Sequence, residues 1–460
     1  PDAIVAQVKE ARVQAEEAQR KAEERAQEQE AKVRAEMEAQ GLDYDEVMAN
    51  AQAERGGPPK FRADEQMRRL DEAQLVLRAS GIEIPPELAA QLGNREQTEA
   101  RFRQMEERLI AMYREQAQYM PAAAAQRGDA REATRRRVLD ARERGQSLAG
   151  TDLTGADLHG LDLSGFDLRG AFLEAVNLEG TDLRGAQLDD AVLTRARLAQ
   201  CDLRGASCRG TNFGAAHLEA TILSECDLTR AVFSEARVAA VTFEGATLQD
   251  STWLNTTIER GSDFRRVVAT KLIGVQLDLS ECDFSVAELP ELILILSRLD
   301  RARFEGADLR EACLVQTTGE DVVFERVRGE SLRVVGESAL PRASFREASL
   351  AKSNFRGANL KQANFNGARL AQGDLSEADL TNATLEGMDA PGLMAIRTDF
   401  SGASLYGSNL MEAIMQKAIL KSADLSEANL FRVDMLRVEV DAQTRLEGAY
   451  TDLLRYRSTS

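Results

Sequence analysis

The sequence predicts a long stacked repeat, from about residue 149 to residue 446, that follows an α-helical region. From Thr151 the chain runs TDLTG, ADLHG, LDLSG and FDLRG, and this period of five continues to about Arg445. A period of five matches neither the 3.6 residues of a helical turn nor the two-residue alternation of a strand. Units this short are stable only when they stack on one another, so the pattern indicates a solenoid. The residues before it are rich in Ala, Glu, Arg, Lys and Gln, which favour helices.

Residues 1–56 are predicted to form one long polar helix. Small and apolar residues recur along it at alternating spacings of four and three, at Ile4, Val8, Ala11, Ala15, Ala18 and Ala22. This spacing draws one narrow, alanine-rich stripe along the helix, which buries little area. The segment is therefore either a solvated spacer or a coiled-coil or docking helix. The chain begins at Pro1 without a methionine, which indicates a fragment or a processed product.

Residues 57–148 are predicted to be a region of shorter helices. Gly41 and the glycine and proline residues at 56–59 break the polar helical pattern. We expect helices at about 43–54, 62–79, 86–92, 95–118 and 129–144, with a flexible joint at Ala122–Ala125. The last of these helices contains three consecutive arginines, Arg135 to Arg137. They form either a solvated face or a contact with the acidic first coils of the repeat.

The central residue of each repeat is predicted to point into the core. All 22 central positions from Leu153 to Ile258 are apolar. The residue two places earlier is usually small, and it fills the space between stacked leucine or phenylalanine layers. The Asp or Asn just before the central residue is expected to bond neighbouring backbone, so we interpret the frequent aspartates as a turn device. The core positions include Leu153, Leu158, Leu163, Leu168, Phe213, Phe355 and Phe365.

The repeat resembles the pentapeptide-repeat family. The family pattern, Ala-Asp/Asn-Leu/Phe-x-Gly, is unbroken in Gly205–Gly214, Glu305–Glu311, Ala358–Gly367 and Leu375–Ala383. The resemblance implies a mainly β fold, a right-handed quadrilateral β-helix in which four successive repeats make one coil. It implies roughly 14 coils and, at about 4.8 Å per coil, a rod of roughly 70 Å. Residues 447–460 would then cap its last coil, because an open end exposes strand edges.

The period of five slips twice, near 258–278 and near 315–344. Extra residues in a stacked sheet form bulges or loops, and partners often bind at such interruptions. We expect a third small loop at Gly387–Ile396, which contains Pro391.

Two groups of residues are candidate partner-binding sites. Ile293 and Ile295 fall out of phase with the core, so they are expected to face outward as an exposed apolar strip. Such a strip suggests a contact with another protein or with a second copy of the chain, unless a loop or the N-terminal helices cover it. A basic belt on an acidic rod is formed by Arg342, Arg346, Lys352, Arg356, Lys361 and Arg369. It would either meet an acidic partner or remain a solvated face.

Charge and composition exclude several function classes. The net charge is −18, of which residues 151–460 contribute −14 through 33 basic and 47 acidic residues. This balance argues against direct nucleic-acid binding, and the absence of a long apolar run argues against a membrane span. The five cysteines, Cys201, Cys208, Cys226, Cys282 and Cys313, fall at core or small positions, which favours reduced thiols in a cytoplasmic protein. The two histidines lack ligand neighbours, and no catalytic spacing, cofactor motif or metal site is present, so we expect no enzyme.

Two functions compete. The first is a protein-interaction scaffold or adaptor. The layout of a Glu/Ala/Arg-rich helix before pentapeptide repeats is similar to the C-terminal half of adaptor proteins of bacterial type VI secretion systems, which implies loading of an effector or spike-tip protein. The second follows from the family resemblance, because some members inhibit or protect a type II topoisomerase (gyrase) as mimics of DNA. The 16 acidic and 8 basic residues of 151–250 favour it, and the basic belt and the helical region count against it.

Overall fold

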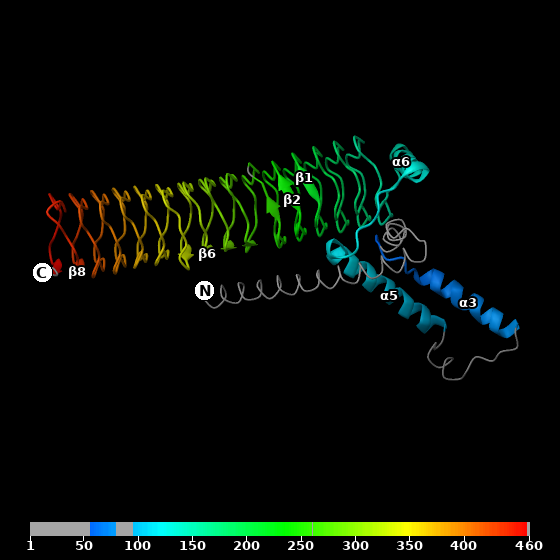
Figure 1. Ribbon diagram of the computed structural model, residues 1–460, viewed down its shortest axis with the longest axis horizontal. Helices are drawn as coiled ribbons and strands as arrows, with labels where there is room; N and C mark the ends of the chain where they lie inside the picture. The colour runs from blue at the N-terminus through cyan, green and yellow to red at the C-terminus, as the bar shows by residue number, and fades with distance from the viewer. Residues whose placement is uncertain (1–55, 80–94, 260, 458–460) are drawn as a thin grey trace, which may run out of the picture.

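A computed structural model describes residues 56–79, 95–259 and 261–457. It shows a straight rod that begins beside α6 (Gly128–Glu143) and runs to the C-terminus (Figure 1). Each residue before a core position pairs in parallel with the residue four repeats later, as Asp152 pairs with Phe172 and Phe172 with Val192. Four repeats therefore make one coil. The predicted right-handed quadrilateral β-helix is confirmed.

The core is one continuous stack of inward side chains. The seven core residues named from the sequence are each at most 1% exposed, namely Leu153, Leu158, Leu163, Leu168, Phe213, Phe355 and Phe365. In the middle of the rod the stack becomes aromatic, and the rings of Phe284 and Phe304 lie 4.8 Å apart and 4° from parallel. The repeat thus places large apolar groups directly over one another, which makes the rod a stiff platform for its outer faces.

The corners are held by the predicted turn device. The amide of Thr154 donates to Oδ1 of Asp152 at 3.0 Å, and the same bond recurs around the rod. The residue two places after the core position has a positive φ, whether it is glycine, as at Gly165 (64°), or not, as at Ala175 (54°). The amide of Ala175 donates to the carbonyl of Thr194 on the next coil at 2.8 Å, so stacking offsets the left-handed conformation.

Three short parallel sheets form along the rod. The strands are β1 (His217–Glu219), β2 (Arg237–Ala239), β3 (Thr257–Ile258), β4 (Ile273–Val275), β5 (Ile293–Ile295), β6 (Cys313–Val315), β7 (Arg333–Val335), β8 (Asp434–Leu436) and β9 (Arg455–Arg457). The sheets have the orders β1-β2-β3, β4-β5-β6-β7 and β8-β9. Elsewhere the same faces are joined by isolated bridges.

The helices gather at the N-terminal end of the rod (Figure 1). They are α3 (Ala63–Ala79), α5 (Arg95–Gln116), the 3-10 turn η1 (Ala117–Tyr119) and α6. These match the helices expected at 62–79, 95–118 and 129–144, whereas those expected within 1–55 and at 86–92 lie outside the described residues. Among the helices that the structure describes, none is both long enough and apolar enough to cross a membrane.

α6 closes the first coil. Val138 and Ala141 are buried in the same cluster as Leu153. Arg135 donates to the carbonyls of Asp157 and His159, at 3.1 and 3.0 Å, whereas Arg136 stays exposed. Arg137 also donates to the carbonyl of Asp152, at 2.9 Å. Of the two interpretations of the arginine run, docking therefore holds for Arg135 and Arg137, which bind backbone carbonyls of the first coil.

The slips are single added residues, and only the first disturbs the stack. Thr242 pairs with Asp263 and Thr318 with Ala339, each one position further along the chain than the partner that a regular coil would supply. Beyond the second slip, pairing continues on all four faces, so no loop opens at 315–344. The coil at Pro391 is regular, since Asp374 pairs with Met394, and the expectation of a loop there is wrong. A third added residue, which sequence analysis missed, lies between Asp424 and Arg445.

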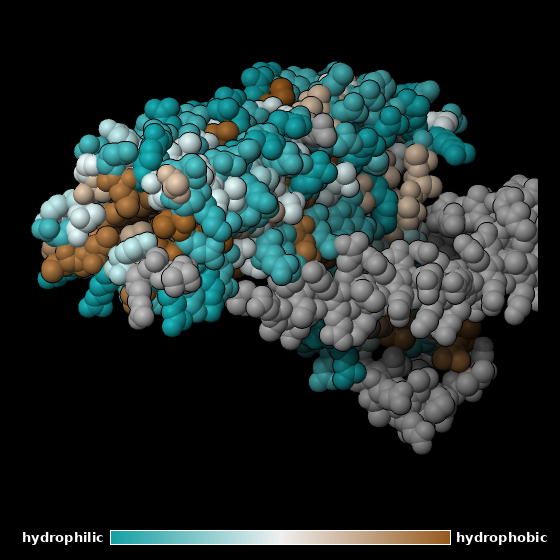
Figure 2. Space-filling view, turned by 60° about the vertical axis from the view of Figure 1, so that its left-hand side comes forward, coloured by the Kyte–Doolittle hydropathy of each residue, from teal (hydrophilic) through white to brown (hydrophobic). Residues whose placement is uncertain are grey.

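Residues 447–457 extend the solenoid instead of folding over its end. Tyr450 pairs with Asn429, and β9 pairs with β8. Figure 2 shows hydrophobic residues gathered at this end of the rod, where Leu446, Tyr450, Leu453 and Tyr456 are 44–65% exposed. The coil continues because its parallel hydrogen bonds to the preceding coil are still made.

Candidate partner-binding face

One of the four faces carries two outward apolar clusters, and we call it the docking face. Its outward column runs from Asp152 through Phe172, Val192 and Asn212 to β4–β7, and on to β8 and β9. Each residue of this column comes directly before a core residue, and Asp or Asn usually occupies that position of the repeat. Apolar residues replace Asp at Phe172, Val192, Ile273 and Ile293, and the four-repeat coil places all of them on the same face.

The C-terminal end of α5 already lies on this face. Tyr113 and Ala117 pack with Phe172 and Val192 in a buried cluster separate from the core. The rings of Tyr113 and Phe172 lie 5.8 Å apart and tilted by 59°. The first coils of the docking face therefore hold a helix through an aromatic contact.

A buried polar cluster locks this contact. Glu174 is fully buried and accepts hydrogen bonds from the Tyr113 hydroxyl, from the Ala123 amide at 3.0 Å and from Arg195 Nη1 at 2.6 Å. Arg195 also donates to the carbonyls of Gln118 (2.8 Å) and Met120 (2.6 Å). Burial, and then the Glu174 charge, raises the pKa of the Tyr113 hydroxyl, which therefore stays protonated as a donor. We call Tyr113, Glu174 and Arg195 the latch.

Sequence reasoning missed the latch. Glu174 and Arg195 follow core positions of adjacent coils on one face, whereas Tyr113 comes from a helix far along the chain. A usable signal was present, because Phe172 and Val192 interrupt the Asp column on successive coils. Nothing in the repeat itself indicated that a tyrosine of α5 would meet them.

Further along, the docking face carries a second apolar cluster, which we call the outer ladder. Ile295 and Val315 are its buried members, and it also includes Val275, Ile293, Leu296, Cys313 and Val335. The register of β4 to β7 places Val275, Ile295, Val315 and Val335 directly beside one another. The ladder is a contiguous outward patch, distinct from the core stack.

The predicted residues Ile293 and Ile295 both lie in this ladder. They face outward, as expected, but the expectation of a freely exposed strip is wrong for Ile295, which is only 9% exposed. The physical reason is that parallel strands place other apolar side chains on either side of it. Those neighbours belong to the coils before and after, so a local pattern in the sequence does not show them.

Between Thr252 and Ile273 the docking face is split, at the first slip. No hydrogen bond joins the backbone of 251–255 to that of 273–275 in the described residues, although the other coils of this face are bonded. A groove of about 370 Å³ opens there, lined by residues 250–254, Lys271, Ile273 and Val275. A second opening lies on the neighbouring face, lined by residues 256–259, Gln276 and Asp278. We call the two openings together the cleft.

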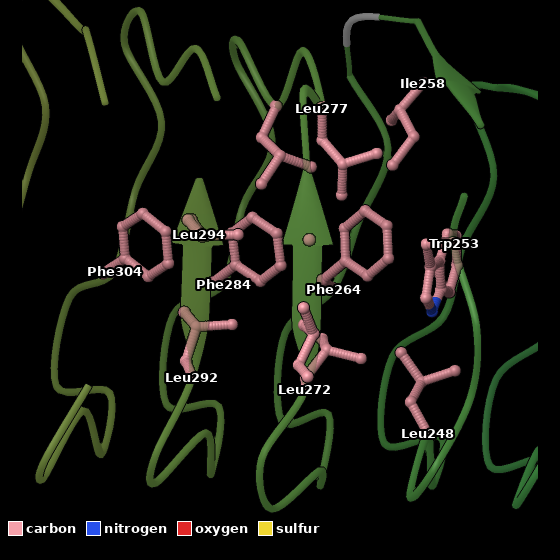
Figure 3. Close-up of a pocket in the computed structure, with 13 residues that line it drawn as sticks. Leu248, Trp253, Ile258, Phe264, Leu272, Leu277, Phe284, Leu292, Leu294 and Phe304 are labelled. Atoms are coloured by element: carbon pink, nitrogen blue, oxygen red, sulfur yellow. The ribbon is translucent and has the colours of Figure 1, made fainter. Parts of the chain in front are cut away.

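The core is loosened directly beneath the cleft. Gly274 occupies a core position, where the side chains of Leu277 and Leu294 fill the space of a Cβ. An apolar cavity of about 30 Å³, lined by Trp253, Phe264 and Leu277 among others, lies beside it. Figure 3 shows these side chains around the cavity, where the Trp253 coil meets the coil of β4. The predicted interruption near 258–278 is thus a true break in the stack on two faces, with pairing retained on the other two, as between Thr242 and Asp263.

The basic belt does not form one patch. The bridges place Arg342 and Lys361 on one face, Arg346 on the next, Lys352 and Arg369 on the third, and Arg356 on the docking face. Four of the six are paired with carboxylates: Arg342 with Glu320 and Asp321, Arg346 with Glu347, Arg356 with Glu377, and Lys361 with Asp379. The belt is dispersed because one coil of the chain passes around all four faces.

Two aspartates of the first coils are paired with arginine. Arg184 forks onto Asp182, and Arg204 onto Asp202, with shortest distances of 2.6 Å. The hydrogen bonds from these arginines hold the pKa of each aspartate below its usual value. At these two positions the repeat presents a paired charge instead of a free carboxylate.

The thiols and histidines occupy different settings. Cys201, Cys208, Cys226 and Cys282 are buried, and burial raises the pKa of Cys226 and Cys282 to about 12. Cys313 departs from the predicted buried position, because it lies half-buried in the outer ladder on β6.

The two histidines lie apart from each other. His159 Nδ1 lies 2.7 Å from Asp157 Oδ1, and His217 is exposed on β1. No cluster suited to a metal ion occurs among the described residues.

Comparison with known proteins identifies the family of the repeat. The family model described as pentapeptide repeats matches eight copies within residues 144–170, 171–210, 211–250, 278–316, 337–367, 358–392 and 396–435. Residues 251–277, which form much of the cleft, are not matched. No curated protein matches the chain.

Three solved structures are similar to parts of the chain. HetL, a pentapeptide repeat protein of the cyanobacterium Nostoc involved in heterocyst differentiation regulation, is 19% identical, with 69% of this chain and 92% of HetL covered and a TM-score of 0.15. QnrB1, a plasmid-mediated fluoroquinolone resistance protein, is 18% identical, with 38% and 92% covered and a TM-score of 0.18. A pentapeptide repeat protein from the Arabidopsis thaliana thylakoid lumen is 30% identical, with 24% and 68% covered and a TM-score of 0.11. The family model matches more than half of the residues of the chain, so the chain belongs to the pentapeptide-repeat family.

Proposed function

We propose that this protein is a non-enzymatic scaffold that binds a partner protein along its docking face. The outer ladder carries the proposal, because it gathers seven apolar or sulfur-containing side chains on the outside of the rod. Contiguous outward apolar patches on polar proteins are typical of interaction sites. The latch supports the same function, since it fixes α5 against the first coils of this face and so sets the direction of the helical arm relative to the rod.

A more specific form of the proposal is an adaptor in a bacterial type VI secretion system, acting in the cytoplasm. The support is the sequence layout, in which a Glu/Ala/Arg-rich segment precedes the repeats. In that role the rod would position an effector or spike-tip protein, and a second copy of the chain is the alternative occupant of the ladder.

Mimicry of DNA against gyrase is the competing function. The net charge of −14 over residues 151–460 favours it. The arginine forks on Asp182 and Asp202 oppose it, because a DNA mimic needs unpaired, regularly spaced negative charge. A supercoiling assay separates the two functions: the scaffold proposal expects no inhibition or protection of gyrase at micromolar protein, and clear inhibition would favour mimicry.

Affinity capture tests the scaffold proposal. Tagged protein is incubated with a bacterial lysate, and bound proteins are quantified by mass spectrometry for the wild type and for the double variant Ile293→Asp, Ile295→Asp. The matched control is Ile414→Asp, which has the same repeat position and face as Ile293 but lies outside the ladder. We expect a partner that the control retains and the double variant loses at least tenfold. Equal recovery by all three proteins would refute a role for the ladder.

A further inference from the structure

We propose that the cleft binds an extended peptide segment of the partner, which adds to the rod as a β-strand between Trp253–Asn255 and β4. The inference rests on the proposed function, since it specifies how a partner engages the docking face. On the rest of this face, backbone amides and carbonyls form hydrogen bonds between successive coils, whereas the corresponding groups at the cleft form none in the described residues.

The regular pattern is clear one coil earlier. Phe233 N donates to Thr252 O at 2.8 Å, Glu235 N donates to Leu254 O at 2.8 Å, and Thr252 N donates to Ala231 O at 3.0 Å. The equivalent donors at the cleft are the amides of Trp253, Asn255 and Ile273. None of these three amides bonds a backbone carbonyl among the residues that the structure describes. Their expected acceptors, the carbonyls of Ser251, Ile273 and Val275, are likewise unused within the described chain.

The two walls are therefore two open strand edges that face each other. An open edge is a template for another strand, because its donors and acceptors alternate at the strand repeat. A helix satisfies its own backbone groups and would leave these edges unbonded, so an extended segment fits the cleft better. The bridges retained on the other two faces, such as Thr247 to Val268, keep the edges from drifting apart.

Side chains on the walls indicate what the segment carries. Leu254 and Ile273 are 53% and 54% exposed, and Val275 belongs to both the groove and the outer ladder. In strand addition, main-chain bonds give affinity and pockets for alternate side chains give specificity. The segment is therefore expected to present apolar side chains at alternate positions and to continue onto the ladder.

Charges at the rim are largely paired within the chain. Among the described residues, Asp250, Glu259, Asp278 and Lys271 border the two openings. Lys271 pairs with Glu291 at 3.3 Å, Glu259 with Arg237 at 2.6 Å, and Asp278 with Arg298 at 3.8 Å. The rim therefore adds little net charge, and the apolar walls decide which segment fits.

The test uses a displayed library of random ten-residue peptides, selected on the full chain and depleted on the variant Ile273→Arg. The best peptide is synthesised with a fluorophore, and its Kd is measured by anisotropy for the wild type, for Ile273→Arg and for Ile414→Arg. The control residue Ile414 has the same repeat position, but its amide is bonded to Leu393 O at 2.8 Å. Circular dichroism and thermal melting check that each variant remains folded.

N-methylation of the peptide, one amide at a time, then tests strand pairing. We expect at least a tenfold loss of affinity at alternate amides and little change between them, and at least a tenfold loss for Ile273→Arg alone. A flat methylation profile, equal binding by Ile273→Arg, or recovery of no peptide that distinguishes the two proteins would overturn the proposal. Ladder-dependent capture with any of these outcomes would leave the scaffold function standing and remove only strand addition. Cleft binding without ladder-dependent capture would support strand addition and remove the proposed role of the ladder.

Discussion

The latch makes a quantitative prediction through Glu174→Gln. The change removes the buried negative charge that faces Arg195 and the Tyr113 hydroxyl, and it places an amide where three donors converge. Removing one member of a buried ion pair costs about 3–5 kcal/mol. Arg195 keeps its carbonyl acceptors and its side chain is 22% exposed, so we expect the lower end, about 3 kcal/mol.

This loss should appear in the docking of α5 and not in the rod. Hydrogen exchange read by mass spectrometry should show roughly a hundredfold faster exchange for amides near Ala117–Ala123, since about 1.4 kcal/mol corresponds to a factor of ten. Amides of the regular coils should be unchanged, because the core stack does not include Glu174. The control is Glu179→Gln, on the next face of the same coil and half exposed. Wild-type exchange in Glu174→Gln would show that the latch does not hold the helix.

Three further predictions concern the core, the thiols and acid. Phe304→Ala opens a gap between Phe284 and Phe324, and thermal melting should show a loss of about 3–5 kcal/mol, whereas an unchanged melting temperature would contradict the stacked core. Maleimide should label one thiol rapidly in the native protein, Cys313, and five after denaturation; rapid labelling of a second thiol would contradict the burial of the others. Hydrogen bonds from Arg184 and Arg204 lower the folded-state pKa values of Asp182 and Asp202, so their stabilisation is present above about pH 4 and is lost as the pH falls through those lowered values. Melting temperatures measured against pH should show it, and a stability that rises on acidification would refute the pairing.

The repeat predicted the fold well because its signal is local and repeated many times. Leu153 and Phe365 occupy the same environment, so one five-residue pattern identifies both as core. The first two slips were also visible, because a single added residue shifts every later core position by one, whereas the third, between Asp424 and Arg445, was missed. The continuity of the coil at each slip could not be seen, since it depends on whether the next coil can still pair.

The candidate site was less accessible to sequence reasoning. Burial of Ile295 depends on Val275 and Val315, which lie one coil away on either side. Dispersal of the belt follows from the same geometry, since Arg342 and Arg346 are close in sequence but lie on different faces. A comparison of residues that lie four repeats apart would have found the docking face, whereas the contact between Tyr113 and Glu174 requires the fold itself.

The central claim is that the docking face is continuous except at one open cleft. Site-resolved hydrogen exchange of the full chain, without any partner, tests it most directly. The amides of Trp253 and Ile273 should exchange at nearly the rate of an unprotected peptide. Their counterparts Phe233 and Ile293, which donate at 2.8 Å to Thr252 O and Leu272 O, should be protected by orders of magnitude. Equal protection of all four amides would mean that the strands are paired across the slip and that the cleft does not exist.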